Sequence, residues 1–308
     1  MIIVPVLERT LGPLSLLGAA GVCAVAWVVG TSVRHCVRVV EPALAARSTD
    51  KAPDKLNMQL DRAGDAVIVV AYVISVALYL RIMAQYVVGY LDPGGSALWE
   101  RSVACVAVAV IVLVGVTRRF ASAGARWIVI TVQGFETVQY LGDRFDAETR
   151  VRASRLAQLV AASIYLGFVA VATPVMGLGT AAGPDNTLLD ITGRVAPWLA
   201  LPLVLSAVLS QFSAAVADTV AAQGNLSGLS RFMRGPTPYL VSGGATVLLA
   251  ATTPTFTIVA VASRAFAAYH AIQAVMAMRT SVGVMRRAGY FALAAVVIAI
   301  ALVAESTG

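Results

Sequence analysis

The amino-acid sequence predicts an all-α integral membrane protein, a polytopic helix bundle with about nine membrane segments. Apolar residues make up 59% of the 308 residues and charged residues only 13%, whereas roughly a quarter of a soluble domain is charged. Mean hydropathy is +0.82. The basic excess, 23 Lys+Arg against 16 Asp+Glu, lies in short gaps between apolar runs. That placement is the topology signal of a membrane protein, so we expect the lipid bilayer and no nucleic acid as a partner.

Membrane spans are expected wherever about 20 mostly apolar residues follow one another. The first run follows Glu8 and Arg9 and is interpreted as a span rather than a cleavable signal peptide. Most loops are short, so residues 1–308 are predicted to form a single transmembrane domain. The predicted segments, in order, are Leu14–Val33, Asp65–Leu91, Ser102–Val116, Trp127–Gly142, Leu156–Met176, Val195–Ala222, Tyr239–Thr252, Thr255–Met278 and Gly289–Ala304.

Loop charges predict the orientation of these segments, because basic loops stay on the cytoplasmic side. Asp92–Glu100 and Gly177–Arg194 carry acidic residues and are expected outside. The expected location is therefore a cell (plasma) membrane, crossed many times, in a bacterium. The loops predicted to share the cytoplasmic side are Arg34–Gly64, Asp143–Arg155, Gln223–Pro238 and Arg279–Arg287.

The fourth segment, Trp127–Gly142, conflicts with this scheme, because the loops before and after it are both basic. Either this segment is re-entrant, or one crossing between the third and fourth segments is missing. We also expect its helix to be broken around Gln133–Glu136, since Gly134 is permissive and the polar run needs a cavity to face. It is the least apolar of the nine, with Gln133, Glu136, Thr137 and Gln139 in its length.

Three stretches near the C-terminus resemble a known family of transporters. They are SQFSAAVADTVAAQGNLSG, YLVSGGATVLLA and TFTIVAVASRAFAAYHAIQAVMAM. They look like the eighth to tenth helices of the amino acid–polyamine–organocation (APC) superfamily, with the closest likeness to the sodium–solute symporter branch of the LeuT fold. AYVISVALYLRIMAQYV resembles the third helix of that fold, and VQGFETVQYLG resembles its interrupted sixth helix.

The resemblance implies a LeuT-like bundle in which the counterparts of the first and fifth helices are absent. A missing fifth helix is the crossing that the loop charges require. In the family, the interrupted first and sixth helices together hold the solute at mid-membrane. The resemblance therefore implies a truncated member that retains half of the solute site.

Ionisable residues inside spans are the sharpest functional clues, because each costs about 2.5–3.5 kcal/mol to insert. Arg81, Arg264 and Glu136 are all expected near mid-membrane and at one level. They form either a charge relay or a substrate-binding level beside the broken helix, or else a structural ion pair that ties helices together. Tyr72 and Tyr79 lie seven residues apart on one helix face and either line the pathway or pack. With Gln133 and Gly134, these residues make up the predicted substrate pathway.

A cation site is predicted on the sixth segment. Asp218 lies about one turn from its cytoplasmic end, and Ser213 and Thr219 offer hydroxyl oxygens nearby. Such oxygens suit Na⁺ or a proton-carrying carboxylate. The alternative is that Asp218 extends to water at the interface.

The sequence favours a secondary transporter of a small organic solute coupled to Na⁺ or H⁺, with no other cofactor. The alternative is a non-transporting membrane scaffold or partner subunit. An enzyme is not expected, since no GxSxG, HExxH or P-loop pattern occurs. The two histidines and three cysteines do not converge on a metal site. The solute, the coupling ion and any homo-oligomeric state are left open.

Overall fold

Helices are the only regular secondary structure in the described parts of the chain. The computed structural model describes residues 11–45, 55–92, 94–117, 139, 142, 145–176, 187–230 and 232–303. The helices are α2 (Ser15–His35), α3 (Glu41–Ala45), α4 (Lys55–Leu91), α5 (Ala97–Val116), α7 (Ala147–Met176), α8 (Thr187–Val195), α9 (Ala200–Leu229), α10 (Thr237–Thr252), α11 (Thr255–Thr280) and α12 (Val284–Val303). A π-helical turn (Cys36–Val40) joins α2 to α3, and 3₁₀ turns precede α2 and α9.

The prediction of an all-α membrane bundle is confirmed. Seven of the described helical stretches are long and apolar enough to cross a membrane. The predicted seventh segment corresponds to α10, which has only 16 residues. The predicted fourth segment lies outside the described residues, apart from Gln139 and Gly142. Whether the predicted fourth and seventh segments also cross the membrane therefore stays a prediction.

Two predicted boundaries differ from the structure. The second segment was expected to start after Gly64, but α4 begins at Lys55 and runs through this glycine for a total of 37 residues. Gly64 is buried where α4 meets α11, and a Cβ there would lie 3.7 Å from Ile272. The helix continues because tertiary packing offsets the low helix propensity of glycine. The sixth segment was expected to span Val195–Ala222, but the helix that corresponds to it, α9, begins at Ala200 after a 3₁₀ turn (Pro197–Leu199) and continues to Leu229.

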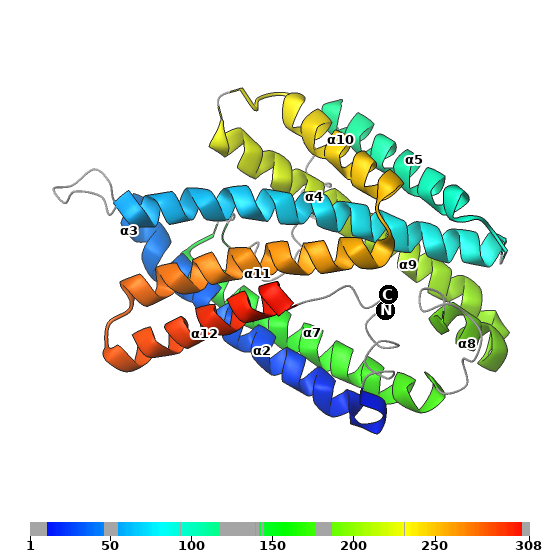
Figure 1. Ribbon diagram of the computed structural model, residues 1–308, viewed down its shortest axis with the longest axis horizontal. Coiled ribbons are helices and arrows are strands. Elements are labelled where there is room, and N and C mark those ends of the chain that lie inside the picture. The colour runs from blue at the N-terminus through cyan, green and yellow to red at the C-terminus, as the bar shows by residue number, and fades with distance from the viewer. Residues whose placement is uncertain are drawn as a thin grey trace.

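α4 lies at the centre of the bundle and packs against α5, α9, α10 and α11 (Figure 1). Its residues Ala77, Leu80 and Ala84 are fully buried. They form a core with Ile111 of α5 and Ile258 of α11. α4 therefore carries Tyr72, Arg81 and Gln85 of the candidate site described below and packs against the helices that carry most of its other residues.

Small residues bring α5 and α10 close together. A Cβ on Gly243 of α10 would overlap the side chain of Val112 on α5. A Cβ on Gly115 of α5 would lie 2.5 Å from the ring of Tyr239 on α10. Close approach through glycine is a common basis of helix association in lipid, where the hydrophobic effect does not drive helices together.

A second group of helices consists of α2, α7 and α12, with α11 joining it to the α4 group. The Gln158 side chain of α7 donates a hydrogen bond to the Ala26 carbonyl of α2 over 2.9 Å. Gly30 lies beside it, and a Cβ there would overlap the Gln158 amide. A polar side chain therefore fixes α7 against α2 at a point where only glycine fits.

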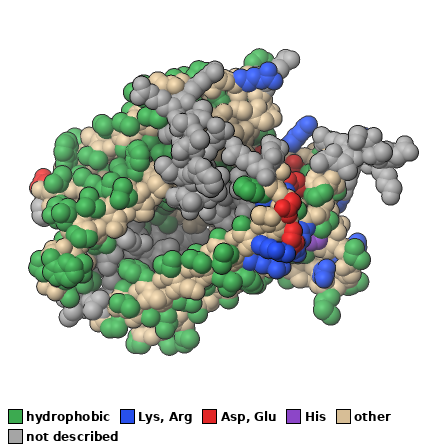
Figure 2. Space-filling model, turned by 180° about the vertical axis from the view of Figure 1, so that it is seen from behind, with side chains coloured by type: hydrophobic (Ala, Val, Ile, Leu, Met, Phe, Trp, Pro, Cys, Tyr) green, Lys and Arg blue, Asp and Glu red, His purple; other side chains and the backbone are tan. Residues whose placement is uncertain are grey.

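Charged side chains gather at one end of the bundle, as Figure 2 shows for one face. This end brings together residues from three of the four loops predicted to be cytoplasmic. Figure 1 places the turn between α9 and α10 at the same end. The clustering agrees with the predicted orientation, while the side of the membrane stays a prediction. The contacts at this end are Arg279 with Asn57 (2.9 Å), His35 with Thr280 (3.0 Å), Arg38 with Glu148 (2.7 Å) and Arg150 with Glu41 (2.7 Å).

Candidate functional site

The predicted pathway residue Tyr72 lies in the interior of the bundle. It is only 1% exposed, and its ring meets that of Phe266 on α11 edge-on, with centroids 6.4 Å apart. Tyr269 of α11 and Ala222 of α9 pack in the same cluster. The cluster therefore joins α4, α9 and α11 around two buried tyrosines.

Tyr269 connects this cluster to the predicted interrupted segment. Its hydroxyl donates a hydrogen bond of 2.7 Å to Oε1 of Gln139, a residue of Trp127–Gly142. Sequence reasoning missed Tyr269, although its spacing of three residues from Phe266 indicates a shared helix face. We call Tyr72, Phe266, Tyr269, Ala222 and Gln139 the tyrosine junction.

A second buried polar group lies farther along α4. The Nη2 atom of Arg81 donates to the Thr255 hydroxyl over 3.3 Å, and Nε2 of Gln85 donates to the same hydroxyl over 3.1 Å. Arg81 and Gln85 are 4% and 3% exposed. Thr255 is the first residue of α11, so this polar group marks the start of that helix. Gln85 and Thr255 were not singled out from the sequence.

The expected meeting of Arg81 and Arg264 at one level is wrong. Arg81 reaches Thr255, which lies nine residues before Arg264 on α11. At 1.5 Å per residue, that separation is about 14 Å along the helix. Arg264 is exposed and is level with the tyrosine junction instead. α4 and α11 are antiparallel, and the packing between them decides which residues of the two helices lie at the same level.

The predicted cation-site residues are divided between different sides of α9. Asp218 and Thr219 are both buried, and Ser213 is half-buried. Successive residues of a helix are rotated by about 100°, and five residues separate Ser213 from Asp218. Helical geometry therefore points the three side chains in different directions, so they do not form one site by themselves.

Thr219 is the member of this set that borders a cavity. The cavity is small, about 10 Å³, and lies between α4, α5, α9 and α10. The hydroxyls of Thr219, Ser242 and Thr246 line it, and each donates to a carbonyl one turn earlier, over 2.7 to 2.9 Å. A space of this size holds about one water molecule. Within the described residues, no group of three or more His, Cys, Asp or Glu is arranged to bind a metal.

The other predicted pathway residues are placed as follows. Tyr79 is half-buried and packs at the edge of the α4 core. Gln133, Gly134 and Glu136 lie outside the described residues. The predicted break in their helix therefore stays a prediction. Of that segment the structure describes Gln139, which accepts from Tyr269 and Arg150, and Gly142, which lies beside Glu41.

Comparison with known proteins gives two findings. A protein 28% identical to this chain occurs in Aquifex aeolicus (strain VF5), where it is described as an uncharacterized protein. The alignment extends over 330 positions and covers 90% of this chain and 79% of that protein. A family model described as "APC superfamily transporter" matches residues 1–126 and 123–304, which is nearly the whole chain. The protein belongs to the APC superfamily of transporters.

Proposed function

We propose that this protein is a secondary transporter-like member of its superfamily, which binds a small organic solute beside the tyrosine junction and couples to Na⁺ or H⁺. The observation that carries the proposal is the hydrogen bond between Tyr269 and Gln139 next to the buried Tyr72. It links α11 to the segment that resembles the interrupted sixth helix. Solutes in LeuT-like proteins bind where interrupted helices expose backbone groups, with neighbouring helices closing the site.

The chemistry of the junction supports a polar organic solute. Two phenols and an amide can each donate and accept hydrogen bonds. The aromatic rings supply apolar surface on the same wall. Small polar solutes bind in such mixed surroundings, where a few oriented polar groups fix the ligand against apolar neighbours.

We further propose that the chain is shortened inside the fold, between its third and fourth predicted segments. The family match consists of two blocks that overlap at residues 123–126, in that interval. The alignment to the Aquifex protein has 330 positions, more than the 308 residues of this chain, so that protein carries additional residues within the match. The block boundary supports the loss of one crossing at the place where the loop charges conflict, and the longer alignment supports a shortening without locating it.

The same shortening favours a second candidate function, that of a non-transporting scaffold or partner subunit. A bundle that lacks a helix next to the solute site retains the packing of α4, α9 and α11 without the full coupling machinery. For this reason we expect weak solute binding and little coupled uptake by the chain alone.

The test combines binding and transport. Purified protein is screened by thermal shift against amino acids, nucleobases and small carboxylates. It is then reconstituted in liposomes with imposed Na⁺ and H⁺ gradients. Tyr269→Phe should abolish any thermal shift, and Tyr90→Phe, at an exposed position on α4, is the matched control.

Three outcomes separate the hypotheses. A solute-induced shift that depends on Tyr269, with little uptake, supports the proposal. Strong gradient-driven uptake abolished by Asp218→Asn contradicts the shortened-member hypothesis and indicates a complete working site. Absence of both binding and uptake across the screen favours the scaffold.

A further inference from the structure

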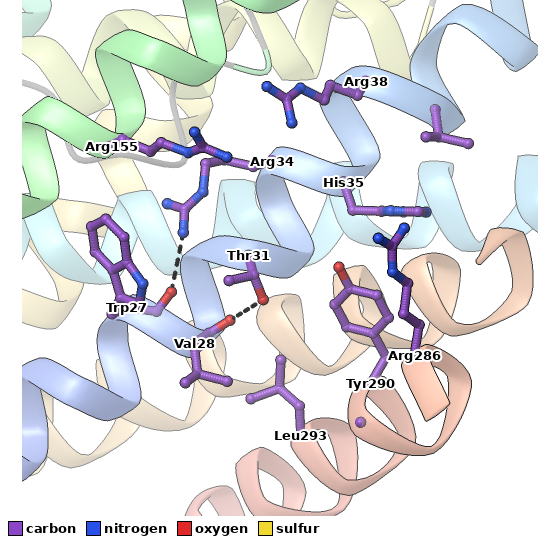
Figure 3. A pocket seen from close by; sticks show the side chains of 12 residues that line it. Trp27, Val28, Thr31, Arg34, His35, Arg38, Arg155, Arg286, Tyr290 and Leu293 are labelled. Carbon is purple, nitrogen blue, oxygen red and sulfur yellow. Dashed lines mark hydrogen bonds between the residues drawn. The ribbon is translucent and has the colours of Figure 1, made fainter. Parts of the chain in front are cut away.

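A basic cavity of about 700 Å³ lies between α2, α7 and α12 at the charged end of the bundle. Among the described residues, its lining contains four arginines, one histidine and no acidic side chain. Figure 3 shows Arg155 and Arg286 approaching from opposite sides of α2, with Arg34 and His35 between them. We call this space the basic pocket; its polar and aromatic lining residues are Trp27, Thr31, Arg34, His35, Arg38, Arg155, Arg286 and Tyr290.

Arg34 forms the fixed wall of the pocket. It is 5% exposed, donates to Oε1 of Gln158 and reaches the Trp27 carbonyl over 3.2 Å. Its guanidinium also lies 4.9 Å from the centre of the Trp27 ring. These contacts hold a permanent positive charge at a defined point, because the arginine side chain stays protonated under all physiological conditions.

The other two walls carry cations with no carboxylate within ion-pair distance among the described residues. Arg155 on α7 and Arg286 on α12 are both exposed. Arg155 acts electrostatically on Arg34, and Arg286 acts on His35. Arg38 also lines the pocket, but its charge is paired with Glu148 over 2.7 Å. Like charges held this close repel one another, so a bound anion would stabilise the arrangement.

The remaining lining indicates what kind of anion fits. Trp27 and Tyr290 are the residue types that are enriched at membrane–water interfaces. Val28, Val39 and Leu293 give one side of the pocket an apolar surface. Arginine binds phosphate oxygens in a bidentate manner, and basic pockets between membrane helices on the cytoplasmic side suit phosphate-bearing lipid headgroups.

We propose that the basic pocket binds the phosphate of an anionic phospholipid headgroup from the cytoplasmic leaflet, with the acyl chains leaving along the apolar side of α2 and α12. Arg155 and Arg286 donate to the phosphate from opposite walls, and Arg34 supplies the fixed charge between them. A free phosphate offers the same anion chemistry but no acyl chains for the apolar side. This site is separate from the tyrosine junction and does not depend on transport.

The test measures thermal stabilisation of the detergent-purified chain by added lipid. Phosphatidylglycerol should raise Tm in a manner that weakens with salt, whereas phosphatidylcholine and inorganic phosphate at equal concentration should have little effect. The double variant R155Q/R286Q should weaken the apparent affinity for phosphatidylglycerol by about tenfold or more, the loss expected from charge-assisted hydrogen bonds.

The matched control is R152Q/R287Q, which removes two arginines from the same two helices outside the pocket lining. It should retain the wild-type response. Loss of folding is monitored by Tm without lipid, which R155Q/R286Q should leave unchanged or higher because repulsion is relieved. Lipid phosphorus that copurifies with each variant gives an independent measure and should fall only in R155Q/R286Q.

Three results would overturn the proposal. Equal stabilisation of both double variants would show that the pocket is not the site. Equal stabilisation by phosphatidylcholine would show that charge is not recognised. Full stabilisation by inorganic phosphate alone would assign the pocket to a soluble anion instead of a lipid.

Discussion

α4 and the α2–α7–α12 group are packed differently. In the most apolar window of α4, 61% of the residues are buried inside the protein, compared with 28% for the stretch that contains α2 and 17% each for α7 and α12; the helices α5 and α9 beside α4 also have 17%, so the dense packing belongs to α4 itself. α4 is surrounded by small and apolar residues, whereas α2 and its π-helical turn are joined to α7 through arginine, glutamine and glutamate near one end. In lipid, exposed apolar surface carries little penalty. Close packing is therefore needed only where a site or a crossing must be held rigid.

The first way to sharpen this comparison is to determine which side of the membrane holds the charged end. Val282, 87% exposed between α11 and α12, belongs to that end, and Leu98, 74% exposed, belongs to the other. In a background without native cysteines, an impermeant maleimide added to whole cells should label Leu98→Cys and not Val282→Cys. Labelling of Val282→Cys before permeabilisation would reverse the orientation and move the basic pocket to the outer leaflet.

The second prediction tests the close packing of the α4 group. Gly243→Ala should lower the free energy of unfolding by about 1–3 kcal/mol, since the added methyl overlaps Val112 and overpacks the interface. Gly244→Ala is the matched control, because nothing lies within 4 Å of a Cβ at the next residue. It should be neutral or stabilising by up to about 1 kcal/mol through helix propensity. Similar losses for both variants, measured by thermal unfolding in detergent, would contradict the packing argument.

The third prediction tests the polar contacts of the second group. Arg150 is buried and pairs with Glu41 over 2.7 Å, while the Glu41 side chain is 32% exposed. Arg150→Met should therefore destabilise the protein by about 1–2 kcal/mol, less than a fully buried pair because water still reaches Glu41. Arg152→Met removes a more exposed arginine of the same helix and should change stability by less than about 0.5 kcal/mol. Equal Tm values for the two variants would contradict a stabilising role of the Arg150–Glu41 pair.

The smallest expected effect concerns the start of α7. The Thr149 hydroxyl and backbone N–H donate to Asp146, and these hydrogen bonds lower the pKa of that carboxyl. A lowered pKa means that the stabilisation is present above the ordinary value of about 4 and is lost as the pH falls through the folded-state pKa. Tm should therefore fall slightly at acid pH. Asp146→Asn keeps a capping side chain and should remove this contribution; an identical pH profile would contradict the assignment.

The sequence predicted the fold class because the physics of a bilayer is local. In hydrocarbon every backbone group must find its partner within the segment, so an apolar run of sufficient length forms a helix whatever its neighbours are. The ends of the helices were less certain. Lys55–Gly64 became part of α4 through contacts of Gly64 with α11, which no propensity at Gly64 indicates.

The candidate site was only partly visible in the sequence. Tyr72 was expected either to line the pathway or to pack, and it lies buried beside α9 and α11, but its neighbour Tyr269 lies 197 positions away and is brought to it by the register of two antiparallel helices. The same register separated Arg81 from Arg264, which depth counting along single helices had placed together. Depth along one helix does not fix the rotation or offset of another.

By itself, then, the sequence determined that this chain is an all-α membrane protein with its positive charge collected in a few loops, because both properties follow from local composition. Only the tertiary structure decided that Arg34, Arg155 and Arg286, from three helices far apart in the sequence, surround one cavity, and that Tyr269 meets Gln139. These groupings depend on which helix faces meet. In lipid that choice is made by glycine contacts and single hydrogen bonds, not by the amount of apolar surface.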